Sequence, residues 1–163
     1  MSFLPIADYK FEKLTAVSPE FLKNAGISLL LLDIDNTVSP YREERPTDEF
    51  LVWVKQMRES GIRLFFVSNN KGSRPEIFSA ATGIPFIKVA RKPSRRGLVR
   101  AMEAEKASKR ETALAGDQIY TDMLAAKRLG ITGILVEPIK FTNPFLAIRY
   151  GLEMPFRIFG KKC

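Results

Sequence analysis

Short apolar runs alternate with amphipathic segments along most of the chain. The first run, Ile27–Ile34, is bounded by Gly26 and a polar cluster, which is typical of a strand buried on both faces. The predicted strands are Ile27–Ile34, Ile62–Val67, Phe86–Val89, Thr112–Ala115 and Gly133–Val136. The predicted helices between them are Thr47–Ser60, Arg74–Ala81, Ser94–Lys109 and Tyr120–Leu129. This alternation predicts an α/β fold, a parallel sheet of about five strands with helices on both faces.

Two segments flank this core, which covers about residues 27–136. Residues 1–26 form an N-terminal extension in which Ser18 and Pro19 start a short helix and Gly26 ends it. Residues 141–163 form an aromatic and basic C-terminal tail. A chain of 163 residues fits one domain, so we expect a single domain over residues 1–163.

Composition narrows the chemistry. The chain has no histidine, which removes the commonest general base and the usual zinc ligand. Its net charge of +8 favours nucleic acid, anionic membrane surfaces or phosphorylated substrates as partners. The lone Cys163 has no internal disulfide partner, and we see neither a signal peptide nor a long apolar span. We therefore expect a cytoplasmic protein. Peripheral binding to the inner face of the membrane is compatible with this location.

Polar clusters follow four of the predicted strands. Asp33 and Asp35 end the first strand, Ser68 and Asn69 follow the second, Lys92 follows the third, and Asp117 follows the fourth, with Asp122 five residues on. In such sheets ligands bind at the carboxyl ends of the strands. Converging carboxylates repel unless a cation neutralises them, and oxygen ligands without histidine or cysteine suit Mg²⁺. A carboxylate can also attack phosphorus to form an aspartyl phosphate.

These clusters resemble the four motifs of haloacid-dehalogenase (HAD) superfamily phosphatases, in the same order. The segment LLLDIDNTVSP resembles D-x-D-x-T, FFVSNN resembles the second motif, Lys92 matches the third-motif lysine, and GDQIYTD resembles G-D-x-x-x-T-D. The match covers about residues 27–136 and implies a Rossmann-like HAD core. The finer pattern, including R-K-P around Lys92, is similar to the YqeG-like group within subclass IIIA, which includes mitochondrial phosphatidylglycerophosphate phosphatases.

The resemblance implies a role for each motif residue. Asp33 would be the nucleophile and a Mg²⁺ ligand. Asp35 would act as general acid and then base, its backbone carbonyl would also bind Mg²⁺, and Thr37 would help to orient it. Ser68, Asn69 and Lys92 would hold the phosphoryl oxygens. Asp117 would complete the metal site, and Asp122 would support it directly, through water or through Lys92.

Each of these residues also has a plain structural interpretation. Asp33 and Asp35 seen alone could form a polar turn, and Ser68 and Asn69 could belong to a helix-capping loop. Asp122 could be a first-turn acid that complements a helix dipole. Arg91 or Arg95 could be confused with Lys92, although the Lys-Pro setting favours Lys92. The ordered set of motifs favours the catalytic interpretation.

The spacing of the motifs leaves no room for a large cap domain, so we expect an open site. Residues 88–100 contain six basic residues and no acid, and the tail adds basic residues interleaved with aromatic ones, a combination that suits anionic lipid. The tail could equally pack on the domain. Our first hypothesis is a lipid head-group phosphatase, acting on phosphatidylglycerophosphate. The alternatives are a soluble sugar or nucleotide phosphate, a nucleic-acid terminal phosphate, or a non-catalytic nucleic-acid-binding or adaptor module. The sequence does not predict the oligomeric state.

Overall fold

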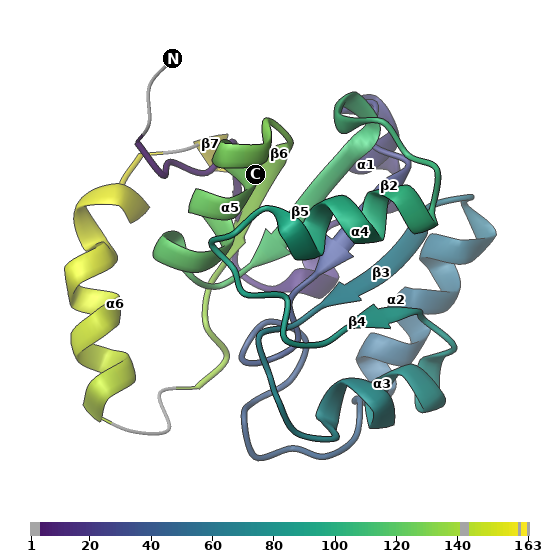
Figure 1. Ribbon diagram of the computed structural model, residues 1–163, viewed down its shortest axis with the longest axis horizontal. Helices are drawn as coiled ribbons and strands as arrows, with labels where there is room; N and C mark the ends of the chain where they lie inside the picture. Colours follow the sequence, from purple (N-terminus) through teal and green to yellow (C-terminus); the bar gives the residue numbers. More distant parts are fainter. Residues whose placement is uncertain (1–3, 141–143, 160, 163) are drawn as a thin grey trace.

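The computed structural model describes residues 4–140, 144–159 and 161–162, and it contains one parallel sheet with helices on both sides (Figure 1). The sheet has seven strands in the order β4-β3-β2-β5-β6-β1-β7. Their bounds are β1 Tyr9–Phe11, β2 Leu29–Leu32, β3 Arg63–Val67, β4 Phe86–Ile87, β5 Thr112–Gly116, β6 Thr132–Val136 and β7 Lys161–Lys162. The predicted α/β class is confirmed. The two strands beyond the expected five, β1 and β7, come from the segments that flank the core.

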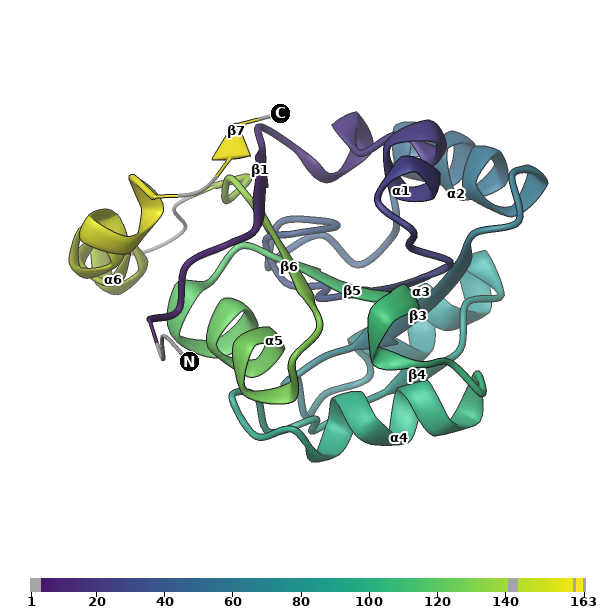
Figure 2. The ribbon, with the colours of Figure 1, turned by 90° about the horizontal axis from the view of Figure 1, so that it is seen from above.

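Helices cover both faces of the sheet. On one face, α1 (Pro19–Asn24), α2 (Asp48–Glu59) and α3 (Arg74–Thr82) bury apolar side chains such as Leu22, Phe50 and Phe78. On the other face, α4 (Arg96–Ala104) and α5 (Leu124–Leu129) bury Leu98 and Leu129. Figure 2 shows α1 and α2 above the sheet and α4 and α5 below it. Since β2 is wholly buried between these layers, its run of four leucines is explained by burial on both faces.

Most predicted elements begin or end one or two residues away from the predicted bounds, and in three of them the backbone conformation shows why. The strand expected to end at Val89 ends at Ile87, because the chain turns and Val89 takes a positive φ of 52°. The helix expected over Ser94–Lys109 is shorter in the structure, where α4 ends at Ala104 because Lys106 takes a positive φ of 51°. A separate 3₁₀ turn, η2 (Lys109–Glu111), follows it. The helix expected from Tyr120 begins as a π-helical turn, η3 (Ile119–Met123), before α5.

The two flanking segments both join the core. Residues before Gly26 supply β1, a 3₁₀ turn η1 (Leu14–Ala16) and α1. The tail forms α6 (Pro144–Arg157), which packs against η3, with the rings of Tyr120 and Phe156 5.8 Å apart. The predicted tail residues Phe141 and Cys163 lie outside the described part of the chain. Among the described residues, no helix is long and apolar enough to cross a membrane.

Candidate active site

The site lies where the chain changes direction in the sheet. From β2 the chain moves outward through β3 and β4, and then returns to the other side of β2 as β5. Asp33 follows β2, Asp117 follows β5, and the Asp33 amide donates to the Ala115 carbonyl at 3.0 Å. The structure therefore brings the first and fourth sequence motifs together at the switch point, where ligands bind in open α/β sheets.

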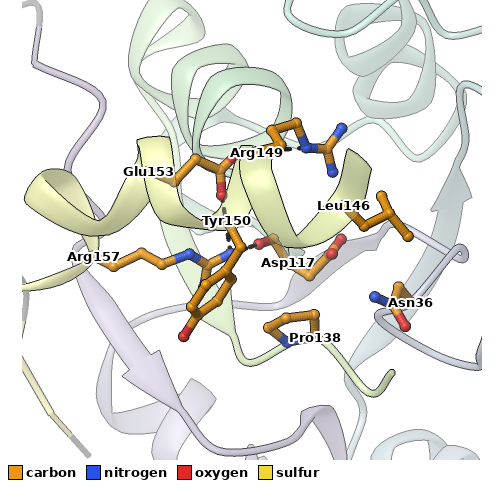
Figure 3. Close-up of a pocket in the computed structure, with 8 residues that line it drawn as sticks. All are labelled: Asn36, Asp117, Pro138, Leu146, Arg149, Tyr150, Glu153 and Arg157. Carbon is orange, nitrogen blue, oxygen red and sulfur yellow. Dashed lines mark hydrogen bonds and ion pairs between the residues drawn. The ribbon is translucent and has the colours of Figure 1, made fainter. Parts of the chain in front are cut away.

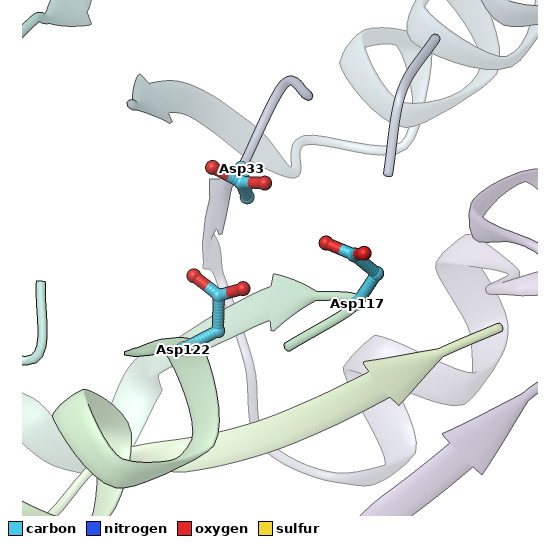
Figure 4. Close-up of side chains that lie close together, drawn as sticks. All are labelled: Asp33, Asp117 and Asp122. Carbon is cyan, nitrogen blue, oxygen red and sulfur yellow. The ribbon is translucent and has the colours of Figure 1, made fainter. Parts of the chain in front are cut away.

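Three buried carboxylates converge at this point. Asp33, Asp117 and Asp122 each offer an oxygen within 4.8 Å of the others (Figure 4). Asp122 comes from the π-helical turn η3, and its Oδ2 accepts the Gln118 amide at 3.2 Å. Gly116 makes this approach possible, because a Cβ at that position would lie 2.3 Å from the Asp122 Cγ.

Lys92 enters the same cluster from the loop after β4. Its Nζ donates to Asp33 Oδ1 and to Asp122 Oδ1, both at 2.6 Å. Asn69 holds the Lys92 backbone from both sides, since its Oδ1 accepts the Lys92 amide at 2.8 Å and its Nδ2 donates to the Lys92 carbonyl at 3.0 Å. Val89 and Arg91 just before it have positive φ angles of 52° and 58°. Such strained backbone persists only where the surrounding structure maintains it, and here it directs Lys92 inward.

Burial dominates the electrostatics of the cluster. Desolvation raises the pKa of Asp33 to about 7, with Lys92 opposing the shift and Asp122 adding to it. Desolvation also raises the pKa of Asp117 well above its ordinary value, and the charges of Asp33 and Asp122 raise it further. Burial by itself would lower the pKa of Lys92, but the charges of Asp122 and Asp33 outweigh it and raise that pKa. Lys92 therefore stays charged, while the carboxylates favour a further cation.

Asp35 lies apart from the three converging carboxylates. Its Oδ1 forms an ion pair with Arg74 Nε at 2.9 Å, and its Oδ2 accepts from Asn70 Nδ2 at 3.1 Å. Arg74 also donates to the carbonyls of Ser39 and Pro40, at 3.1 and 2.7 Å, so it fixes the loop that carries Asp35. Arg74 was not anticipated from the sequence, because nothing in its local pattern links the start of α3 to the first motif.

Thr37 and Ser68 occupy supporting positions. The Thr37 hydroxyl lies 3.2 Å from Asp117 Oδ1 and 3.4 Å from Asp33 Oδ2. The hydroxyl therefore contacts these two carboxylates, and the expected role of Thr37 in orienting Asp35 stays a prediction. Ser68 is fully buried, and its Oγ accepts the Asn70 amide at 3.0 Å. It is not among the residues that line the cavity described below.

A cavity of about 300 Å³ opens beside Asp33, Asp35 and Lys92. Its lining includes Asp33, Asp35, Tyr41, Asn69, Asn70, Lys92, Gln118, Thr121 and Arg149. Sequence reasoning missed Tyr41, Gln118, Thr121 and Arg149 as lining residues. Gln118 and Thr121 stand inside the fourth motif, which could have drawn attention to them, whereas Arg149 comes from α6 and carries no local signal. Burial, with the charges of Asp117 and Asp33, raises the pKa of Tyr41 to about 12.

Charged side chains of α6 attach this helix to the end of β5. Figure 3 shows Arg157, Glu153 and Tyr150 facing the segment that carries Asp117. Arg157 donates to the Asp117 carbonyl and pairs with Glu153 at 3.0 Å. The Tyr150 hydroxyl donates to Glu137 Oε2 at 2.8 Å. The tail thus packs on the core beside the site, which was one of the two alternatives left open by the sequence.

The converging side chains suit a hard divalent cation. Asp33, Asp117 and Asp122 supply oxygen only, and the excess of buried negative charge calls for a cation beyond Lys92. The donor set therefore fits Mg²⁺ better than zinc or copper, which prefer nitrogen and sulfur.

A family model and a named relative both match this chain. A family model described as HAD-hydrolase-like matches residues 89–142. The probable phosphatase YqeG of Bacillus subtilis (strain 168) is 34% identical over 156 residues, which cover 96% of this chain and 89% of that protein.

Among solved structures, the cobalt-bound deoxy-D-mannose-octulosonate 8-phosphate phosphatase of Haemophilus influenzae has a TM-score of 0.57 at 13% identity, covering 70% of each chain. The 3-deoxy-D-manno-octulosonate 8-phosphate phosphatase of Moraxella catarrhalis, in complex with magnesium, phosphate and KDO, has a TM-score of 0.50 at 19% identity. It covers 61% of this chain and 63% of that one. At these identities the likeness shows the shared fold.

Proposed function

This chain belongs to the YqeG-like phosphatases of the HAD superfamily, and from that membership we propose that it hydrolyses its substrate through a phosphoaspartyl intermediate on Asp33, with Mg²⁺ as cofactor. One observation carries the proposal. The three carboxylates of Asp33, Asp117 and Asp122 converge within 4.8 Å, and Lys92 contacts two of them. Two phosphatases of similar fold, one described as cobalt-bound and one as in complex with magnesium, are consistent with a metal cofactor for this chain.

In the first half-reaction, an Asp33 oxygen attacks phosphorus and the bond to the leaving oxygen breaks. Asp35 gives its proton to that oxygen, which leaves as an alcohol. Asp35 is suited to this role because it lines the cavity, and Arg74 and Asn70 hold its carboxylate in one orientation. Lys92 balances negative charge on the phosphoryl group as it transfers.

In the second half-reaction, water attacks the phosphoryl group on Asp33. Asp35, now ionised, takes a proton from that water, and the phosphorus–Asp33 bond breaks to release inorganic phosphate and the free carboxylate. Asp33, Asp117 and the backbone carbonyl of Asp35 would hold Mg²⁺, with Asp122 positioning Lys92 and supporting the site. The bound ion supplies positive charge that offsets repulsion between the Asp33 carboxylate and the substrate phosphate.

Hydrolysis of p-nitrophenyl phosphate tests the catalytic assignment. We expect wild-type activity to require Mg²⁺ and Asp33→Asn to lose at least about 10³-fold in kcat, since an amide cannot serve as the nucleophile. Asp48→Asn, an exposed acid of α2, is the matched control and should keep wild-type activity. Near-normal turnover by a folded Asp33→Asn protein would refute the assignment.

The substrate we propose is the phosphate monoester of an anionic lipid head group, such as phosphatidylglycerophosphate. Two features support it. The segments between the motifs contain α2, α3 and short loops without a cap domain, so the cavity is open to a bulky substrate. The protein also carries a net charge of +8, which attracts anionic surfaces. Turnover of phosphatidylglycerophosphate should exceed that of soluble sugar and nucleotide phosphates in kcat/KM, and the reverse order would favour a soluble substrate.

A further inference from the structure

The polarity of α6 is reversed relative to that of an ordinary surface helix. Its side toward the core buries the charged residues Glu153 and Arg157, which are 1% and 4% exposed, beside the apolar Leu146 and Phe156. Its outer side carries large apolar residues at helical spacing, and two more exposed apolar residues follow directly after the helix. We call this surface the α6 outer face and define it as Phe145, Ile148, Leu152, Ile158 and Phe159, which are 59–70% exposed. A helix of a water-exposed surface normally has the opposite arrangement.

The inner contacts hold α6 in this orientation. Arg157 donates to the Asp117 carbonyl and pairs with Glu153, while Tyr150 donates to Glu137. Tyr120 donates to the Leu152 carbonyl at 3.1 Å, and its ring packs on Phe156. Rotating the helix to bury the outer face would break these contacts and leave buried charges unpaired. The apolar outer face is therefore a stable feature of the fold, and exposed large apolar residues gathered on one element are typical of an interaction site.

Charge around the outer face identifies the partner. The sequence from Pro138 to Cys163 contains one acid, Glu153, and it is buried in an ion pair. The basic residues of the same segment are Lys140, Arg149, Arg157, Lys161 and Lys162, of which Arg157 is buried and paired with Glu153. An apolar stripe in a segment whose other charged residues are basic is the pattern of a helix that lies in the interface of an anionic bilayer. Docking of a second copy through this face would instead bring two basic segments together.

The active site and α6 are directly connected. Arg149 of α6 lines the catalytic cavity. Asn36, within the first motif, exchanges two hydrogen bonds with the Lys140 backbone, at 2.9 and 3.0 Å, just before α6. The contacts of Arg149 and Asn36 place the cavity beside α6. A membrane bound to α6 would therefore bring lipid head groups close to Arg149 and the cavity.

From these observations we infer that the α6 outer face docks the protein on an anionic lipid bilayer, with α6 lying flat in the interface. This inference rests on the proposed lipid head-group substrate and adds the surface that delivers it. The helix anchors the protein without spanning the bilayer, in keeping with its 14 residues. Arg149 then lies where it can attract the head-group phosphate.

Co-sedimentation with vesicles tests the inference. The full chain is mixed with phosphatidylcholine vesicles that contain or lack phosphatidylglycerol. We expect binding to the anionic vesicles that weakens with salt. The variant Phe145→Ser/Ile148→Ser/Leu152→Ser should bind at least about tenfold more weakly, because three apolar side chains no longer enter the interface. The matched control Leu51→Ser/Val52→Ser/Ile77→Ser changes three exposed apolar residues of α2 and α3 and should bind as wild type does.

Two further measurements keep the outcomes distinct. All three proteins should hydrolyse p-nitrophenyl phosphate equally, which shows that each is folded and that catalysis is intact. In a separate variant, Ile148→Trp, fluorescence should shift to the blue on anionic vesicles, whereas the native Trp53 is already buried. Docking is contradicted if active wild-type protein fails to bind anionic vesicles at low salt, if the α6 variant binds as tightly as wild type, or if that variant only turns a dimer into a monomer. Absence of phosphatase activity in wild-type protein would count instead against the proposed function.

Discussion

At the scale of single residues, Asp33 is subject to two opposing requirements. A nucleophile must be ionised, yet burial and the neighbouring Asp122 raise the pKa of Asp33 to about 7. Lys92 opposes this effect at 2.6 Å, but it is shared with Asp122. A divalent cation among the three carboxylates would remove the remaining excess charge. The residue that carries the chemistry is therefore also the residue that most needs the metal.

Asp33 and Asp117 give the metal-free protein a defined pH dependence. Both have pKa values raised in the folded state, so between about pH 4 and pH 7 the folded protein holds more protons than the unfolded chain. The free energy of unfolding therefore falls as pH rises through this window. Because Mg²⁺ displaces these protons, its stabilising effect should grow over the same window.

Thermal unfolding with Mg²⁺ and with a chelator checks this expectation. The increase in Tm due to Mg²⁺ should be about 5 °C larger near pH 8 than near pH 5. In Asp117→Asn, which removes one proposed ligand, most of this difference should disappear. An equal effect of Mg²⁺ at both pH values would show that these carboxylates do not bind the ion.

The motif residues could be predicted because polar clusters follow the apolar runs, and the family resemblance supplied their roles. Arg74, Tyr41 and Arg149 could not be predicted. Arg74 and Arg149 reach the site from α3 and α6, which are distant from the first motif in sequence, and Tyr41 reaches it through the fold of the loop that follows the first motif. Thr37 was expected in the right place, but its hydroxyl faces Asp33 and Asp117 because the first loop turns back at Asn36, which has a φ of 63°.

At the scale of elements, the junction between β5 and η3 is the most tightly constrained. Gly116 ends β5, and the π-helical turn η3 brings Asp122 back against it. π-Helical turns are rare in proteins overall, and those that do occur are often found at functional sites. The sequence indicated a helix from Tyr120, but its periodicity could not distinguish an α-helical first turn from a π-helical one.

Gly116→Ala tests this junction. The new Cβ would lie 2.3 Å from the Asp122 Cγ, so Asp122 must move away from Lys92. We expect kcat to fall about 10²-fold and stability to fall by about 1–3 kcal/mol. Gly151→Ala is the matched control, since its Cβ would meet open space on α6, and it should keep full activity. Activity within about twofold of wild type in Gly116→Ala would contradict the positioning role of Asp122.

At the scale of the whole molecule, the order of strands explains the position of the site. The alternation of apolar runs and amphipathic segments predicted a parallel α/β sheet, and the structure confirms it. This sequence pattern did not predict β1 and β7, because strands of three and two residues are too short to show a periodic pattern of apolar residues. The change in strand order between β2 and β5 brings the motifs together at the carboxyl ends of these strands. The helix α6 then contributes Arg149 to the lining of the cavity and exposes apolar residues on its outer side.

The central claim is that Asp33 becomes phosphorylated during turnover, and the variant Asp35→Asn tests it most directly. With p-nitrophenyl phosphate the leaving group needs no proton, so the first half-reaction should proceed while the second lacks its base. Stopped-flow absorbance should show a burst of about one nitrophenolate per protein, and mass spectrometry after an acid quench should find one phosphoryl group on Asp33. If wild-type protein turns over while this variant shows no burst, or carries the phosphoryl group on another residue, the mechanism is contradicted.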